Sequence, residues 1–288
     1  MKNSRFQTVI ISLIIGLSVG SGTSYILENN HNRIPNAVEV TISSDESTNR
    51  DLVSGNLLAV AWQQNSGEVN ALRYQAYNSA MNYVDKLVKE KTTKPYAVTL
   101  DIDETIIDNS PHAGYEIKHS DPYSSENFNK WIQKADAKAI PGAKEFTDYA
   151  KSKGIEVFYV SNRKEDIHLD ATIKNMKKLG FVNSDKEHIL LKTNDSDKAP
   201  RWNKIEEKYN LAMYCGDNLG DFPNGYYNKS NEERNKIVKE QSTYFGNKYI
   251  VLPNPVYGDF ENAIYNYNLN KTPSEKIQDR LNSIKSFK

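Results

Sequence analysis

The sequence predicts an α/β protein with a largely parallel sheet, and two observations lead to that prediction. After Pro95, short runs of apolar and β-branched residues alternate with longer segments of helical period, which is the pattern of βαβ units. The first run, Tyr96–Leu100, ends directly at Asp101 and Asp103, and open α/β sheets bind ligands at the carboxyl ends of their strands. A chain of 288 residues is long enough to bury a core around such a sheet.

The first 28 residues are predicted to be a targeting segment that is separate from the fold. Lys2 and Arg5 precede an uncharged stretch over 6–27, and its densest apolar part, 9–19, has the length of a signal-peptide core. The whole stretch is also long enough to span a bilayer. A cleaved signal peptide and an uncleaved anchor therefore both fit, and in either case the positive-inside rule places the rest of the chain outside the cytoplasm.

A polar segment over 29–56 follows and is rich in Asn, Ser and Glu, so it is predicted to be a flexible stalk. The folded domain is expected to occupy 57–288. Its first element is predicted to be a helix from Ser66 to about Glu90, because apolar residues recur there at three- and four-residue spacing and Ser66 can cap the start.

Strands and helices then alternate along the chain. The predicted strands are Tyr96–Leu100, Ile155–Val160, His188–Leu191, Leu211–Cys215 and Tyr249–Leu252. Two predicted helices are Ala143–Lys153, which is followed by Gly154, and Pro200–Tyr209. A third is marked by Leu169, Ile173, Met176 and Leu179 and ends at Gly180. Crossovers between the strands are expected to be right-handed.

The sheet core is expected over about 95–256, and the remaining parts are expected to form a small, mostly helical subdomain. Those parts are 57–94, 110–139 and 257–288. Residues 110–139 carry prolines and aromatic residues with little regular period, so they are predicted to lie above the strand ends and cover the site.

Polar side chains follow the predicted strands or precede a predicted helix at four places. They are Asp101, Asp103 and Thr105; Ser161 and Asn162; Lys198; and Asp217 with Asp221. Each place alone is a weak signal, since Ser-Asn after a strand is usually a turn and a lone Lys usually lies on the surface. All four in this order are hard to produce by chance.

Phosphoryl transfer explains this set of residues. Carboxylates such as Asp101 and Asp217 supply the oxygen ligands that Mg²⁺ prefers. One carboxylate can attack phosphorus and form an aspartyl-phosphate, while its neighbour protonates the leaving oxygen and then activates water. Ser161 and Lys198 can hold the phosphoryl oxygens, and such positioning and charge stabilisation supplies most of the catalysis in this reaction class.

The same residues resemble the four motifs of the haloacid dehalogenase (HAD) superfamily. Longer strings resemble the class C non-specific acid phosphatases, which are bacterial surface or secreted enzymes with nucleotidase activity. These strings are Ala-Val-Ala-Trp-Gln-Gln-Asn-Ser over 59–66, Leu-Asp-Ile-Asp-Glu-Thr-Ile-Ile-Asp-Asn-Ser-Pro over 100–111, Gly-Asp-Asn-Leu-Gly-Asp-Phe over 216–222 and Pro-Asn-Pro-Val-Tyr-Gly over 253–258. The resemblance covers roughly residues 56–288 and implies a HAD-like Rossmannoid sheet with helices on its faces.

The resemblance also implies a role for each acid and one Mg²⁺ in the active site. Asp101 would be the nucleophile and a metal ligand. Asp103 would be the general acid/base, with its backbone carbonyl on the metal. Asp217 would be the third protein ligand, and Asp221 would orient water bound to the metal.

Further residues would bind the substrate. Thr105, Ser161, Asn162 and Lys198 would bind the phosphoryl group, and Arg201 would support that site. Phe128, Trp131 and Tyr257 fall where the family places aromatic groups that stack on a nucleobase or aryl group, although plain packing explains such residues equally well.

The expected function is that of an extracytoplasmic, Mg²⁺-dependent acid phosphatase, anchored at the surface of a bacterium or secreted from it. It would hydrolyse small phosphomonoesters, namely nucleoside monophosphates and aryl phosphates. A specific metabolite phosphatase of the same superfamily and a non-catalytic surface binding protein on the same fold are the alternatives. A homodimer is implied by the resemblance alone.

Composition excludes some other classes. Lys plus Arg and Asp plus Glu both number 37, so no field of one sign indicates a nucleic-acid polymer as partner. Cys215 is the one cysteine, which rules out an intramolecular disulfide and a Cys-based zinc site. No cysteine lies directly after the apolar stretch, so a lipid-modified N-terminus is not expected.

Overall fold

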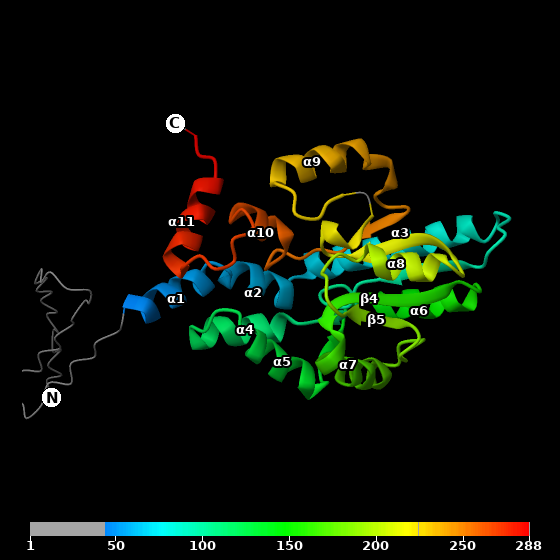
Figure 1. The fold of residues 1–288 in the computed structure, drawn as a ribbon, viewed down its shortest axis with the longest axis horizontal. Coiled ribbons are helices and arrows are strands. Elements are labelled where there is room, and N and C mark those ends of the chain that lie inside the picture. Colours follow the sequence, from blue (N-terminus) through cyan, green and yellow to red (C-terminus); the bar gives the residue numbers. More distant parts are fainter. Residues whose placement is uncertain (1–43, 224, 288) are drawn as a thin grey trace, which may run out of the picture.

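The computed structural model describes residues 44–223 and 225–287, and its centre is a five-stranded sheet with helices on both faces (Figure 1). The strands are β1 (Tyr96–Leu100), β4 (Glu156–Lys164), β5 (Ile189–Lys192), β6 (Asn210–Gly216) and β7 (Tyr249–Val251). They lie in the order β5-β4-β1-β6-β7, and every neighbouring pair is parallel. The α/β prediction is confirmed, and the carboxyl ends of β4, β1 and β6 meet at one edge.

Helices fill the connections between strands and the ends of the described chain. They are α1 (Ser44–Ser54), α2 (Leu57–Asn65), α3 (Gly67–Leu87), α4 (Ser110–His119), α5 (Ser125–Lys134), α6 (Ala143–Ser152), α7 (Glu165–Leu179), α8 (Ala199–Glu206), α9 (Asn231–Glu240), α10 (Asp259–Ile264) and α11 (Pro273–Ser283). Short 3₁₀ turns occupy η1 (Leu219–Asp221) and η2 (Ser242–Tyr244), and β2 (Ile107–Asp108) pairs antiparallel with β3 (Lys138–Ala139).

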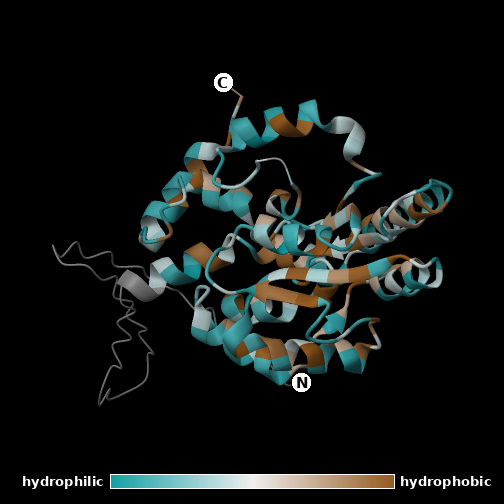
Figure 2. Cartoon of the chain, turned by 45° about the vertical axis from the view of Figure 1, so that its right-hand side comes forward, coloured by the Kyte–Doolittle hydropathy of each residue, from teal (hydrophilic) through white to brown (hydrophobic). Residues whose placement is uncertain are grey.

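The two faces of the sheet bury two separate apolar clusters, because alternate strand residues point to opposite sides. One cluster joins Val98, Leu100 and Cys215 to α3, α6 and α7. The other joins Ala97 and Tyr214 to α8 and to the segment before α9. Figure 2 shows the hydrophobic strands enclosed between helices whose outer faces are hydrophilic. The molecule is therefore doubly wound, with the strand ends left free to build a site.

Helix α3 belongs to the sheet and not to the helical subdomain, which corrects the sequence-based expectation for this part of 57–94. Tyr77, Ala80 and Val84 on α3 are buried in the cluster that covers the sheet. The helix contacts α6 and β7. A helix of 21 residues carries a long apolar face, and part of that face is buried against the sheet.

Part of the predicted stalk is folded, which is a second correction. Helix α1 lies inside 29–56, its Leu52 and Val53 are buried, and it packs against α4 and α11. Arg280 of α11 donates a hydrogen bond to the carbonyl of Leu52 (3.0 Å). The targeting segment and residues 29–43 of the stalk lie outside the described residues. Within the described residues, no helix has both the length and the apolar character needed to cross a membrane.

The segment over 110–139 is more regular than its sequence indicates, since it contains α4, α5 and β3. Both helices are short, and each ends at a left-handed residue, Ser120 and Ala135 respectively. Helix α4 packs against α1 and α2, whereas α5 packs against α7. The segment over 110–139, called the cover below, is thus joined both to the N-terminal helices and to the sheet domain.

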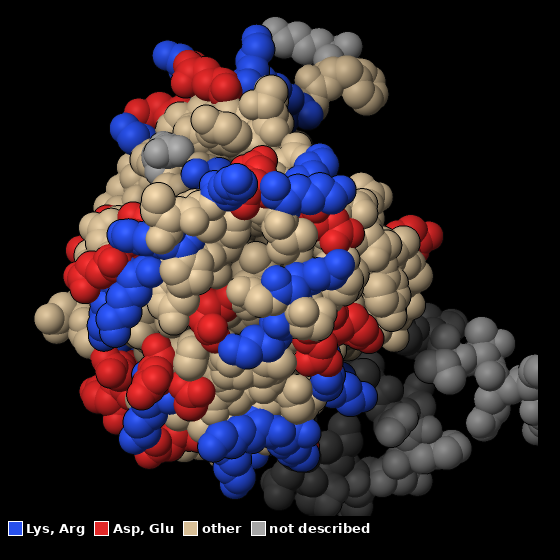
Figure 3. Space-filling model, turned by 90° about the vertical axis from the view of Figure 1, so that its right-hand side faces the viewer, with Lys and Arg blue, Asp and Glu red and all other residues tan. Residues whose placement is uncertain are grey.

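Charges on the surface are mixed. Figure 3 shows one face of the molecule, on which Lys and Arg side chains are interspersed with Asp and Glu side chains. This agrees with equal numbers of the two charge types in the chain.

Candidate active site

Three carboxylates meet where β1 and β6 end. Asp101 continues β1, and its amide donates to the carbonyl of Cys215 on β6 (2.9 Å). Asp217 follows β6 directly, and Asp221 closes the 3₁₀ turn η1. One oxygen from each of the three carboxylates lies within 4.8 Å of those from the other two. Because β1 and β6 are neighbours, the fold itself brings Asp101 and Asp217 together.

Gly216 lets Asp221 return to this cluster. A Cβ atom at position 216 would lie 2.3 Å from both the Cβ and the Oδ2 of Asp221, which is far too close for any side chain. Asp221 is held over the glycine by its own turn, since its Oδ2 accepts a hydrogen bond from the amide of Asn218 (2.9 Å). A glycine at the end of β6 is therefore required for the third carboxylate to join the other two.

Lys198 is the cation of the cluster. It lies at the start of α8, is 3% exposed, and its Nζ contacts both Asp101 and Asp221, the latter at 2.6 Å. Burial lowers the pKa of Lys198, but the two carboxylates outweigh burial and raise it. Burial raises the pKa of Asp101 to about 7 even though Lys198 opposes that shift. One ammonium group therefore does not fully balance the acids.

Asp217 has only neutral partners among the described residues. Its Oδ1 accepts from the Thr105 hydroxyl (3.3 Å) and its Oδ2 from the amide of Asn254 (2.8 Å). Burial, followed by the charges of Asp221 and Asp101, raises the pKa of Asp217 well above its ordinary value. A further cation next to Asp217 would remove this penalty, and hard carboxylate oxygens in such an arrangement fit Mg²⁺ or a similar divalent ion.

Asp103 faces a different set of partners. The guanidinium of buried Arg163 donates to its carboxylate from Nη2 (2.8 Å) and Nε (3.0 Å). Ser161 (3.3 Å) and Asn109 (2.7 Å) also donate to it. Burial favours the neutral acid, but Arg163 outweighs burial and lowers the pKa of Asp103. Two acids two residues apart thus have opposite pKa shifts, because different charged partners surround them.

The predicted phosphate-binding residues lie beside these acids. Ser161 is fully buried, and both it and Asn162 lie within β4, which extends four residues beyond the predicted strand end at Val160. Arg201 on α8 donates to the Ser161 carbonyl (2.5 Å) and the Asn162 side chain (2.8 Å). It also donates to the carbonyls of Ser196 and Asp197, so it joins the end of β4 to the loop that carries Lys198.

The three aromatic residues named from the sequence occupy two places. Trp131 and Tyr257 are hydrogen-bonded to residues next to Asp103: the Trp131 indole donates to Asn109 (2.7 Å), and the Tyr257 hydroxyl donates to Glu104. Phe128 instead packs edge-on against His112, with ring centroids 5.2 Å apart, and against Tyr123. Trp131 is thus joined to Asp103 through Asn109, and Tyr257 through Glu104 and Asn109, whereas Phe128 belongs to an aromatic cluster within 110–139.

Four polar residues of the site were missed from the sequence: Glu104, Asn109, Arg163 and Asn254. Arg163 directly follows Ser161 and Asn162, and this adjacency to a predicted motif was the one available signal. Glu104 adopts a left-handed backbone conformation (φ 54°), which is uncommon for a residue with a side chain and is frequent at functional sites. Nothing in the spacing of Asn109 or Asn254 indicates their contacts with Asp103 and Asp217.

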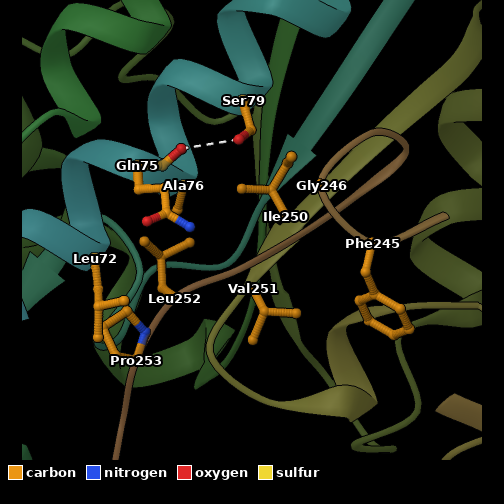
Figure 4. A pocket seen from close by; sticks show the side chains of 10 residues that line it. All are labelled: Leu72, Gln75, Ala76, Ser79, Phe245, Gly246, Ile250, Val251, Leu252 and Pro253. Carbon is orange, nitrogen blue, oxygen red and sulfur yellow. Dashed lines mark hydrogen bonds between the residues drawn. The ribbon is translucent and has the colours of Figure 1, made fainter. Parts of the chain in front are cut away.

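A separate pocket of about 330 Å³ lies on the flank of the sheet. It is bounded by α3 and by the edge strand β7 with its flanking residues (Figure 4). Its lining residues are Leu72, Gln75, Ala76, Ser79, Phe245, Gly246, Ile250, Val251, Leu252 and Pro253. None of these residues carries a charge, so this pocket is a poor place for a phosphate group.

A buried acid on α4 gives a prediction about stability. Glu116 lies 3.4 Å from His112, and burial followed by repulsion from Asp121 raises its pKa from 4.5 to about 7. The native state therefore keeps this proton to a higher pH than the unfolded state does. The contribution of Glu116 to stability is most favourable below about pH 4.5 and declines as the pH rises toward about 7.

Replacing the acid should remove this decline. We expect Glu116→Gln to be more stable than the wild type by on the order of 2 kcal/mol above pH 7, with a smaller difference near pH 5. Urea denaturation of both proteins across this range measures the effect, and carboxylates common to both cancel in the difference. Parallel stability curves for the two proteins would contradict the prediction.

Comparison with known proteins places this site in a family. The chain matches the family described as HAD superfamily, subfamily IIIB (Acid phosphatase), over residues 36–260. Acid phosphatase 1 of Solanum lycopersicum is 25% identical over 129 residues, which are 42% of this chain and 49% of that protein. A stem 31 kDa glycoprotein of Glycine max is 27% identical over 167 residues, 54% of this chain and 57% of that protein. The chain thus spans about half the length of the curated relatives it matches.

Solved structures give a longer match. The class C acid phosphatase of Bacillus anthracis is 40% identical, with a TM-score of 0.80, and the match covers 82% of this chain and 99% of that chain. A second structure of that enzyme, with tungstate bound, has the same identity and a TM-score of 0.79. The chain therefore belongs to the class C acid phosphatases, in subfamily IIIB of the HAD superfamily.

Proposed function

We propose that the protein is a metal-dependent phosphomonoesterase that acts outside the bacterial cytoplasm on nucleoside monophosphates and aryl phosphates. The observation that carries the proposal is the cluster of Asp101, Asp217 and Asp221 at the strand ends, with Lys198 as its one cationic contact among the described residues. A pure binding protein has no need of so many costly buried charges.

The residues present fit a divalent cation. Among the described residues, Asp217 accepts hydrogen bonds from neutral donors only. Burial and repulsion within the cluster are left partly uncompensated, as the raised pKa values of Asp101 and Asp217 indicate. Asp101, Asp217 and the backbone carbonyl of Asp103 would hold the ion, with Asp221 beside them. When bound, Mg²⁺ would neutralise charge on the phosphoryl oxygens and on the carboxylates.

Asp101 and Asp103 divide the chemistry between them. The Asp101 carboxylate attacks phosphorus, the bond from phosphorus to the ester oxygen breaks, and Asp103 gives its proton to that oxygen. Asp103 then removes a proton from water, which attacks the aspartyl-phosphate and releases inorganic phosphate. Ser161, Asn162, Thr105 and Lys198 hold the phosphoryl oxygens, and Arg201 keeps the two phosphate-binding segments in place. Tungstate in the Bacillus anthracis enzyme is an oxyanion of similar shape to phosphate, which supports an oxyanion site here.

The contacts of Asp103 support an acidic optimum. As a general acid it must carry a proton when the substrate binds, and Arg163 lowers its pKa. The protonated fraction of Asp103 therefore rises as the pH falls. Asp101 attacks as a carboxylate, so the first step quickens in acid only when a bound cation offsets the burial that raises the pKa of Asp101 to about 7.

Hydrolysis by the purified protein tests the proposal. We expect turnover of p-nitrophenyl phosphate and of AMP that is fastest in acid, that EDTA abolishes and that added Mg²⁺ restores. Turnover of one phosphorylated metabolite alone would favour the specific metabolite phosphatase. If the protein showed no metal-dependent turnover of any phosphomonoester, the proposal would be wrong and a binding protein would be favoured.

A further inference from the structure

Asn109 is the centre of a buried hydrogen-bond network beside Asp103. It is 3% exposed, and its side-chain Nδ2 donates to Asp103 (2.7 Å) and to Glu104 (3.1 Å). Its Oδ1 accepts from the indole N–H of Trp131 (2.7 Å). The orientation of this amide is fixed by its partners, because a flipped amide would turn its oxygen toward two carboxylates and its NH₂ toward an N–H donor.

Glu104 extends this network to a second aromatic residue. Its carboxylate is buried and accepts from the Tyr257 hydroxyl, from Asn109 Nδ2 and from the Asn109 backbone amide (2.8 Å). The backbone of Glu104 is left-handed, and the Glu104 amide donates to the Ile107 carbonyl (2.9 Å), which closes a tight loop after β1. This loop brings the Glu104 side chain to its partners. The Glu104 side chain thus points toward Asn109 and Tyr257.

The network joins segments that are far apart in the sequence. Trp131 lies on α5 in the cover, Tyr257 lies in the segment between β7 and α10, and Asp103 lies at the end of β1. Tyr257 is 40% exposed although its hydroxyl is bonded to Glu104, so part of its ring faces solvent. Each of the two aromatic rings is therefore tied through Asn109 or Glu104 to the carboxylate that handles the proton.

We propose that Asn109 is a positioning residue that orients Asp103 for proton donation and joins that orientation to Trp131 and, through Glu104, to Tyr257. The inference rests on the proposed function and deepens it. A leaving group that stacks on the two rings holds the indole and the phenol in place, and these hold the amide of Asn109 against Asp103. A substrate without such a group leaves the cover freer and Asp103 less well aligned.

The leaving group provides a test that distinguishes positioning from general structural support. The alkoxide released from AMP is a strong base and needs a proton in the transition state, whereas p-nitrophenolate is a stable anion that departs without one. The ratio of kcat/KM for AMP to kcat/KM for p-nitrophenyl phosphate therefore reports how well Asp103 donates its proton.

We expect Asn109→Ala to lower kcat/KM for AMP by about 10- to 100-fold, which is part of the usual contribution of a positioned acid. The value for p-nitrophenyl phosphate should fall by less than about 3-fold on the same grounds. Trp131→Phe and Tyr257→Phe each keep a ring and remove one hydrogen-bond donor, so they should shift the ratio in the same direction by a smaller factor. KM for AMP should stay near the wild-type value in both ring variants.

Asn175→Ala is the matched control. Asn175 is also 3% exposed and also holds the cover, since its side chain bonds the backbone of Ala137 on both sides, but it has no hydrogen bond with Asp103. It should lower stability and leave the ratio unchanged.

Equal losses on both substrates in Asn109→Ala would overturn the positioning role. If that variant does not fold, wild-type ratios in both Trp131→Phe and Tyr257→Phe would overturn it instead. Failure of the proposed function would look different, because the wild-type protein would then hydrolyse neither substrate.

Discussion

Asp101→Asn is expected to abolish turnover and leave the fold intact. The amide has the shape of the carboxylate but is a poor nucleophile, so kcat should fall by about 10⁴-fold or more, as when other enzymes lose theirs. The same change removes one of three crowded acids, while Lys198 keeps its contact with Asp221 at 2.6 Å. Thermal unfolding of the metal-free variant should therefore occur no lower than in the wild type.

Measuring both kcat and the unfolding temperature distinguishes loss of the nucleophile from loss of activity through unfolding. Asp148→Asn on α6 is a matched control, because Asp148 pairs with Lys144 at the surface and has no contact with the site. It should retain wild-type turnover. More than about a tenth of wild-type activity in Asp101→Asn would remove Asp101 as the nucleophile.

The sequence could predict the acids because the rule that governs them is simple. Strands of a parallel sheet end at one edge, so polar residues after Tyr96–Leu100 and Leu211–Cys215 were expected at the same edge, and the pairing of β1 with β6 then brings them together. The association of Asp221 with Asp101 and Asp217 is less predictable. It depends on the 3₁₀ turn over Leu219–Asp221, which returns the carboxylate over Gly216.

The partners of Asp103 could not be read from spacing. Asn109 reaches Asp103 through a loop whose course depends on the left-handed Glu104, and a local pattern of residue types does not encode that dihedral angle. Helix α1 escaped detection for another reason. Its sequence is polar, and it is held by α11, whose Arg280 bonds Leu52 across 228 residues of chain. Contacts of this range override local composition.

Lys198→Met is expected to be the most destabilising single change in the site. The side chain is 3% exposed and contacts Asp101 and Asp221, so its removal leaves buried acids without their cation. Loss of one partner from a buried ion pair typically costs about 3–5 kcal/mol. Turnover should fall by about 10²- to 10³-fold, because one donor to the phosphoryl oxygens is lost as well.

Added Mg²⁺ should restore the stability of Lys198→Met without restoring its turnover. A divalent cation among the three carboxylates supplies the missing charge, so the ion should raise the unfolding temperature of the variant more than that of the wild type. Lys204→Met, an exposed position on the same helix, is the control and should match the wild type with and without the ion. A Lys198→Met variant that is as stable as the wild type in EDTA at neutral pH would contradict this prediction. It would mean that the acids carry protons there and that the stability of the metal-free site does not depend on the charge of Lys198.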